Sequence, residues 1–232
     1  MTDLLIETPQ QPGETARRYA YRLLYENIMS LAFPPGMVLS DVELAQSLRI
    51  SRTPVREAIV SLQEAKLVEV YPQRSSCVSR LDLDAIEEGI FLRYHAECGI
   101  FRECVRKASG KDISALHTNL LEQEKCLQNN ELKRYFALDN EFHKQLYLIA
   151  GKPWVWETVT RIVTHHNRAR LLQAQLGSDR LMATHQAHWD MFDAITSHSS
   201  QSMDDFIYHH LTAGYRADLP EMLRLYPDYF AI

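Results

Sequence analysis

Residues 40–62 read SDVELAQSLRISRTPVREAIVSL, and this stretch decides the fold of the N-terminal part of the chain. Ser40 and Glu43 have the spacing of a capping box, in which the serine hydroxyl accepts the amide of the glutamate and the glutamate reaches back. A second helix follows Ser51, whose hydroxyl is a predicted cap. Pro54 lies in its first turn, where a missing amide costs no intrahelical hydrogen bond. The stretch therefore predicts two short helices joined by a tight turn.

The segments on either side of this stretch extend the pattern. Residues 15–31 have apolar side chains at helical spacing, and the Phe-Pro-Pro-Gly sequence at 33–36 stops that helix. Farther along, two short β-like runs at 68–71 and 77–79 enclose a polar turn. Three helices followed by a hairpin are typical of a winged helix-turn-helix.

The remainder of the chain has a different character. From about residue 82 to residue 226 it is rich in helix formers at helical apolar spacing, with no convincing strand. Breaks between helices are expected near residues 109–110, 128–130, 151–153, 176–178 and 197–202. The expected fold class is mainly α, with an N-terminal winged helix-turn-helix and a C-terminal all-α bundle of roughly six or seven helices. We expect a flexible tail at 1–14, the winged helix at 15–80 and the bundle at 81–232.

The net charge of -5 is distributed unevenly. Residues 15–80 hold nine Lys and Arg against six Asp and Glu, whereas residues 81–232 hold sixteen against twenty-one, which suits a DNA-contacting module joined to another domain. With no secretory signal and no long uncharged apolar run, we expect a cytoplasmic protein without a membrane partner. The four cysteines lack Cys-x-x-Cys spacing and are predicted to be reduced thiols, mostly buried.

The start of the second helix in residues 40–62 carries donors suited to DNA. The inward apolar stripe of this helix is predicted to be Val55, Ala58, Ile59 and Leu62. Arg52 and Arg56 lie one turn apart on the opposite face, and an arginine fork can address guanine O6 and N7 together. Ser51 and Thr53 can bond phosphate oxygens, and Arg74 at the hairpin tip can enter the minor groove. Two arginines at this spacing can also be a solvated face, but the surrounding helices and hairpin favour sequence-specific binding of double-stranded DNA.

Three predicted helices of the bundle carry histidines, and one a carboxylate, on their apolar faces. These residues are Asp139, His143, His188 and His210. Buried imidazoles and carboxylates are costly unless they are paired or bound to a metal. One aspartate and three histidines can form a partial shell for Zn²⁺ or another divalent transition ion. Alternatively, each is a hydrogen-bonded polar group of the core or its boundary, and His185 and His209 compete with His188 and His210 for the same roles.

The remaining histidines and two tryptophans are interpreted as structural residues without a binding role. Four histidines lack inward apolar neighbours and are expected at the surface or its boundary: His117, His165, His166 and His198. Trp154 and Trp156, after a Gly-Lys-Pro break, are interpreted as core residues rather than as a stacking platform.

The N-terminal motifs resemble the winged helix of GntR-type regulators. The resemblance rests on Phe33-Pro34-Pro35-Gly36, Leu44-Ala45, Ser51-Arg52-Thr53-Pro54-Val55-Arg56-Glu57-Ala58 and Leu62. It implies DNA contacts from the wing and from Ser51, Arg52, Thr53 and Arg56. Two positions depart from the family, since Val42 stands where some members have a DNA-contacting arginine and Ser75 where the wing usually has glycine.

The C-terminal motifs resemble the effector-binding FCD domain of the FadR-type subgroup. They are Arg93-x-x-x-Glu97, Asp139-x-x-Phe142-His143, His188 followed by Ala194-Ile195, and His210-Leu211. The resemblance implies a dimerisation domain whose metal ligands are the aspartate and three histidines of these motifs. It also implies that an inward arginine holds a small organic acid, and the candidates are Arg93 first, then Arg102, Arg168 and Arg170. Tyr94 and His95 interrupt the usual aliphatic run.

These patterns lead to three functional hypotheses. The first is a homodimeric repressor in which each monomer offers one recognition helix to DNA, controlled by a small carboxylate effector bound near zinc, nickel or manganese. The second is a regulator for which the metal itself is the signal. The third is a metal-dependent hydrolase, because the same ligands can activate water. No motif nominates a general base beside those ligands, so we do not expect an enzyme.

Overall fold

The computed structural model describes residues 8–71, 76–177, 181–198 and 203–231. The chain divides into two units, one made of Met1–Leu83 with Tyr226–Ile232 and the other of Asp84–Leu225. Every helix within the described ranges is too short or too polar to cross a bilayer.

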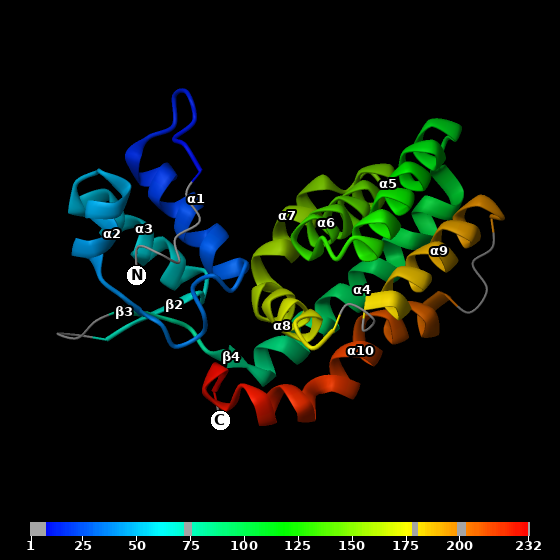
Figure 1. Ribbon diagram of the computed structural model, residues 1–232. Helices are drawn as coiled ribbons and strands as arrows, with labels where there is room; N and C mark the ends of the chain where they lie inside the picture. The colour runs from blue at the N-terminus through cyan, green and yellow to red at the C-terminus, as the bar shows by residue number, and fades with distance from the viewer. Residues whose placement is uncertain (1–7, 72–75, 178–180, 199–202, 232) are drawn as a thin grey trace. The chain divides into compact units, whose positions relative to one another are not determined.

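Three helices surround the core of the first unit: α1 Ala16–Met29, α2 Asp41–Leu48 and α3 Arg52–Glu64. Both α1 and α2 pack on α3 (Figure 1). The inward stripe predicted for α3 is confirmed, because its buried residues are Val55, Ala58, Ile59 and Leu62. This packing leaves the opposite face of α3 exposed.

The helix starts differ in detail from the predicted caps. Ser40 is the N-cap of α2, and its hydroxyl accepts the amide of Glu43 at 3.3 Å. The return bond from the Glu43 carboxylate does not form among the described residues. Only one of the two hydrogen bonds of the predicted capping box is therefore present. Ser51 is the N-cap of α3, but its side chain makes no capping bond. Its exposed hydroxyl therefore stays available to an external partner.

The wing is a three-stranded antiparallel sheet in the order β1-β3-β2, with β1 Val38–Leu39, β2 Val68–Val70 and β3 Ser76–Val78. The hairpin β2–β3 was predicted, and in the structure Val68 of β2 lies opposite Val78 of β3. β1 was not predicted, because a strand of two residues has no readable alternation. Arg74 and Ser75, on which two predictions rest, lie outside the described residues.

The C-terminal end of the chain lies outside the helical bundle, although residues 81–232 were expected to form it. After the short 3₁₀ helix Pro227–Tyr229, β5 Phe230–Ala231 pairs in parallel with β4 Leu81–Asp82. Phe230 is 2% exposed and its partner Leu81 is fully buried. The last residues therefore belong to the first unit and not to the bundle, and two apolar residues fix a pairing too short to show in a sequence pattern.

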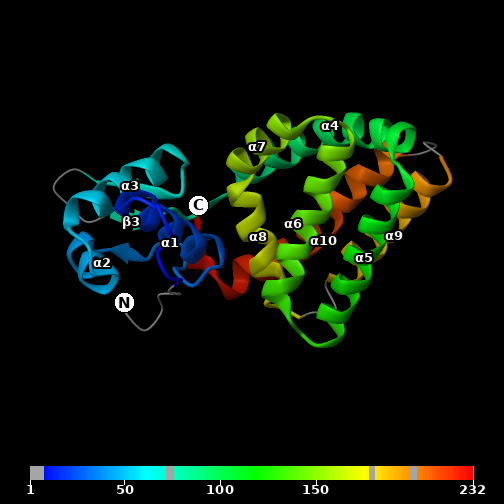
Figure 2. The ribbon, with the colours of Figure 1, turned by 90° about the horizontal axis from the view of Figure 1, so that it is seen from above.

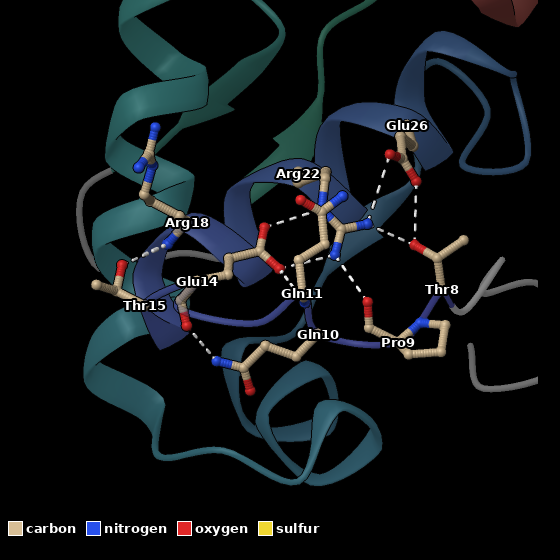
Figure 3. Close-up of polar contacts among 9 residues, drawn as sticks. All are labelled: Thr8, Pro9, Gln10, Gln11, Glu14, Thr15, Arg18, Arg22 and Glu26. Atoms are coloured by element: carbon tan, nitrogen blue, oxygen red, sulfur yellow. Dashed lines mark hydrogen bonds and ion pairs between the residues drawn. The ribbon is translucent and has the colours of Figure 1, made fainter.

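The segment before α1 is held by polar contacts that its composition did not indicate (Figure 3). Arg22 of α1 donates to the Glu14 carboxylate at 2.8 Å and to the carbonyl of Pro9 at 3.1 Å. Glu14 also accepts the amide of Gln11 at 3.0 Å. Residues 8–14, expected to be part of a flexible tail, thus lie against α1.

The described part of the second unit contains seven helices. They are α4 Leu83–Lys107, α5 Gly110–Gln128, α6 Leu132–Ile149, α7 Pro153–Ile162, α8 Thr164–Ala174, α9 Met182–Thr196 and α10 Met203–Leu225. The breaks agree with the Gly, Pro, Ser and Asn clusters in the sequence. The break at Val163 between α7 and α8 was missed, because no such residue marks it.

Helix packing decides which side chains the bundle buries. α5 packs against α6 and α9, and α10 packs against α8 and α9 (Figures 1 and 2). Trp154 at the start of α7 is 81% exposed, so its prediction as a core residue is wrong. Trp156 is half-buried, and its ring centroid lies 5.3 Å from that of Tyr147. Val159 is the one fully buried residue of α7, and Trp154 belongs to the part of the helix that faces solvent.

Candidate DNA-reading surface and metal centre

The N-terminal end of α3 presents the predicted DNA-contacting residues to solvent. Ser51, Arg52, Thr53 and Arg56 are all exposed. The side chains of Arg52 and Arg56 are 51% and 62% exposed. They project from the face opposite the buried stripe, as a recognition helix requires.

One carboxylate binds both of these arginines. Arg52 Nη2 donates to the two carboxylate oxygens of Asp41 at 3.3 and 3.1 Å, and Arg56 Nε donates to Asp41 Oδ2 at 2.5 Å. Burial alone would raise the pKa of Asp41, but the hydrogen bonds from Arg56 and Arg52 outweigh it and hold that pKa below its ordinary value. Asp41 is the first residue of α2, so this contact joins the two helices.

The second site lies inside the bundle, where α6, α9 and α10 each contribute one histidine. Ligand atoms of His143, His188 and His210 all lie within 4.8 Å of one another. Asp139 lies one turn before His143 on α6, and its Oδ1 is 3.5 Å from His188 Nε2. Three of the four predicted metal ligands therefore form one cluster, and the fourth borders it.

The nitrogens of this cluster fit a metal ion. His188 Nδ1 bonds Gln123 Oε1 at 3.0 Å, which makes Nδ1 the donor and leaves Nε2 as a free acceptor. Within the described chain, His188 Nε2, His210 Nδ1 and both ring nitrogens of His143 are shut off from solvent and have no hydrogen bond. Buried polar atoms without partners are rare in folded proteins, and such nitrogens are the ligands that Zn²⁺ prefers.

The protonation states also suit metal binding. Burial lowers the pKa of His188 to about 4, and it lowers the pKa values of His143 and His210 well below the ordinary range. Burial would raise the pKa of Asp139, but the charge of Arg170 and the nearby imidazoles hold it well below its ordinary value. At neutral pH the site therefore offers neutral imidazoles and an ionised carboxylate.

The structure brings together two of the four candidate arginines. Arg170 of α8 donates to both oxygens of Asp139, at 2.8 and 3.1 Å. Arg93 of α4 is buried and donates to Glu97 at 2.7 Å, while Glu97 Oε2 lies 3.6 Å from His143 Nδ1. Both guanidinium groups thus lie beside the histidine cluster.

The other two arginines point elsewhere. Arg102 is 57% exposed and pairs with Asp204 at the surface. Arg168 is fully buried and donates to His165 at 3.4 Å. Because it lies two residues from Arg170, it points to nearly the opposite side of α8. Neither side chain joins the cluster.

The structure distinguishes His185 and His209 from the histidines of the cluster. His209 is exposed, so it cannot replace His210. His185 is buried, but its Nε2 accepts the indole hydrogen of Trp189 at 3.1 Å. His117 and His198 are exposed as predicted.

Comparison with known proteins decides the family. The model for "Bacterial regulatory proteins, gntR family" matches residues 16–78, and the model for the FCD domain matches residues 88–213. The chain belongs to the GntR family. The resemblance found in the sequence motifs is thereby confirmed for both parts of the chain.

Several relatives of this GntR protein are transcriptional regulators by name. It is 28% identical over 208 residues to the "HTH-type transcriptional repressor RspR" of Escherichia coli (strain K12), which covers 90% of this chain and 91% of that protein. It is 35% identical over 187 residues to an "Uncharacterized HTH-type transcriptional regulator in unstable DNA locus" of Streptomyces ambofaciens, covering 81% of this chain and 78% of the other. This GntR protein is a DNA-binding transcriptional regulator and not an enzyme, so the hydrolase hypothesis is set aside.

Solved structures share the fold. The structure titled "E. coli McbR/YncC" has a TM-score of 0.73 and 17% identity, covering 91% of this chain and 99% of that one. A putative GntR regulator from Rhodococcus sp. RHA1 has a TM-score of 0.69 and 20% identity, covering 90% and 98%. A winged helix followed by a helical bundle is thus the architecture of this GntR regulator.

Sequence reasoning missed part of the surroundings of the GntR protein's histidine cluster. His165 and His166, predicted at the surface or boundary, are 5% and 1% exposed. They begin α8, which α10 covers, and no local pattern shows this. Gln123, which orients His188, was also missed. Glu97 was quoted only as part of a motif, although its spacing of four from Arg93 could have indicated the ion pair.

Proposed function

We propose that this protein is a homodimeric transcriptional repressor that responds to a small organic acid bound near a divalent metal ion, with zinc first and nickel or manganese as alternatives. The observation that carries the proposal is the set of buried nitrogens without hydrogen bonds on His143, His188 and His210. Together with an exposed pair of arginines on α3, it supports one signal-receiving site and one DNA-reading surface in the same chain.

The DNA-reading part of the proposal rests on the first turns of α3. Arg52 and Arg56 would address base edges in the major groove, while Ser51 and Thr53 would bond phosphates. The exposure of these residues and the open Ser51 hydroxyl support this assignment. Each monomer of a dimer would offer one such helix to half of a near-palindromic operator.

The metal would be held by His143, His188 and His210, with Asp139 as the fourth ligand. A metal of this kind supplies a Lewis acid to which an organic carboxylate binds. Gln123 would keep the His188 ring in place through its hydrogen bond at 3.0 Å.

The effector would be a small carboxylate, because Arg93 and Arg170 lie beside the cluster and both are buried or nearly so. Each of these arginines already has a carboxylate partner, so an entering acid must compete with Glu97 or Asp139. To change DNA binding, the effector must bind more tightly to one arrangement of the protein than to the other.

Metal titration tests the signal-receiving site. Wild type, stripped with chelator and titrated with Zn²⁺ in a calorimeter, should bind one ion per chain, and His188→Ala should bind at least ten-fold more weakly. His209→Ala is the matched control, because this neighbouring histidine is exposed and outside the cluster. Equal Zn²⁺ affinity in wild type and His188→Ala would contradict the assignment.

Gel shifts test the DNA-reading part and separate the two possible signals. Arg52→Ala with Arg56→Ala should abolish sequence-specific binding, whereas Arg106→Ala, which removes an exposed arginine of the bundle, should not. Metal-free and zinc-loaded protein are then compared with and without citrate as a probe acid. A change with zinc alone would favour the metal as the signal, and a change only with the acid present would support the proposed effector.

A further inference from the structure

We infer that Asp41 is a specificity-determining residue of the DNA-reading surface, because its carboxylate holds Arg52 and Arg56 side by side and restrains them from binding phosphates indiscriminately. This inference rests on the proposal that the two arginines read the operator. Asp41 is not among the predicted DNA-contacting residues, and it lies on α2, whereas the two arginines lie on α3.

The contact geometry joins the three side chains into one unit. Arg52 and Arg56 are separated by one turn of α3, and the Asp41 carboxylate from α2 accepts hydrogen bonds from both. No other acidic side chain pairs with either arginine in the described part of the chain. The orientation of the two guanidinium groups in the free protein is therefore set by a single residue.

Each arginine keeps donors for DNA while it is bound to Asp41. Arg52 uses only Nη2 and Arg56 uses only Nε in these bonds. The remaining guanidinium nitrogens have no partner among the described residues, and both side chains are more than half exposed. An arginine that is already oriented loses less conformational freedom when it binds a guanine edge.

Asp41 is not required to hold the fold together. The Asp41 side chain is 23% exposed, but both arginine partners are more than half exposed, and ion pairs that solvent screens in this way contribute little to stability. α2 also starts with the capping hydroxyl of Ser40 and has Glu43 in its first turn, so its N-terminus retains an acidic residue without Asp41. The carboxylate thus acts chiefly on the arginines.

The charge of Asp41 also affects binding to random DNA. Affinity for any sequence grows with the number of phosphates that basic residues neutralise. A carboxylate between Arg52 and Arg56 reduces the positive charge at this end of α3 and repels phosphate oxygens. Wild type should therefore gain operator affinity through orientation and lose non-specific affinity through charge, and both effects raise the ratio of specific to non-specific binding.

The test compares Asp41→Asn, Asp41→Glu and the charge-matched control Glu43→Gln in the full chain. Fluorescence anisotropy measures Kd for a duplex enriched by wild type from a random library and for a scrambled duplex of the same composition. Asp41→Asn should weaken binding to the enriched duplex and tighten binding to the scrambled one, lowering their ratio at least roughly ten-fold. Its slope of log Kd against log salt on scrambled DNA should steepen by about one. Asp41→Glu should restore most of the ratio, and Glu43→Gln should leave it unchanged.

Several results would overturn the inference. One is a ratio for Asp41→Asn within two-fold of wild type, and another is an equal fall for Glu43→Gln, which would show a general charge effect. Failure of Asp41→Asn to fold, measured by circular dichroism, would make Asp41 a structural residue instead. If wild type discriminates and Asp41→Asn does too, only the role of Asp41 fails, whereas a wild type without discrimination removes the proposed reading surface as well.

Discussion

Replacing Arg170 with methionine should destabilise the bundle strongly in metal-free protein. Arg170 makes two hydrogen bonds to Asp139, whose side chain is fully buried, and is itself only 13% exposed. Removing one partner of a buried ion pair leaves an uncompensated charge and costs about 3–5 kcal/mol. The carboxyl of Asp139 can take up a proton instead, so we expect a value of about 3 kcal/mol at pH 7.

The pH dependence of this loss follows from the pKa of Asp139. Because Arg170 holds that pKa well below its ordinary value of 3.8, the ion pair stabilises the folded state above about pH 4. This contribution disappears as the pH falls through the folded-state pKa. Without Arg170, burial raises the pKa of Asp139 in the variant, so the difference in free energy of unfolding between wild type and Arg170→Met should be largest at neutral or higher pH and should shrink as the pH falls below that raised pKa.

Urea unfolding with chelator present, followed by tryptophan fluorescence, measures the effect, because the three tryptophans, at positions 154, 156 and 189, all belong to the second unit. Arg102→Met is the matched control, since its ion pair with Asp204 is exposed and should contribute less than about 1 kcal/mol. A loss for Arg170→Met below 1 kcal/mol, or equal to the control, would refute the idea that the buried Asp139 depends on Arg170.

Three other predictions concern stability. Since burial lowers the pKa of His188 to about 4, metal-free protein should lose about 2 kcal/mol between pH 7 and pH 5 from this residue alone, and a urea midpoint constant over that range would contradict it. Gly214→Ala places a Cβ 2.7 Å from Nε2 of Gln173, which is bonded to Asp218, so thermal unfolding should show a loss of about 1–3 kcal/mol; an unchanged Tm would mean that Gln173 yields freely. Leu62→Ala empties a fully buried position and should cost about 2–5 kcal/mol, measured by circular dichroism, with a loss below 1 kcal/mol arguing against that burial.

The predictions from sequence succeeded where the deciding interactions are local. The stripe Val55, Ala58, Ile59 and Leu62 follows from helical spacing, and all four residues are buried. The helix breaks at Gly and Pro clusters follow from backbone preferences of single residues. The same reasoning placed Asp139 and His143 on one inward face, and both are buried.

Sequence reasoning failed where a distant element determines the surroundings of a residue. His166 is buried because other helices of the bundle cover it, and Trp154 is exposed because α7 buries little of its surface. Phe230 pairs with a strand about 150 residues earlier in the chain. Spacing along one helix carries no information about which helix lies opposite.

The amino-acid sequence by itself determined the fold class and nominated the candidate DNA-reading helix and the residue types of the candidate metal centre, because these follow from periodicity, caps and motifs within single segments. Only the tertiary structure decided which acidic side chain forms an ion pair with which arginine: Asp41 with Arg52 and Arg56, Glu97 with Arg93, and Asp139 with Arg170. The reason is physical. A buried or shared charge depends on the groups within a few ångströms of it, and except in the Arg93–Glu97 pair those groups come from other helices.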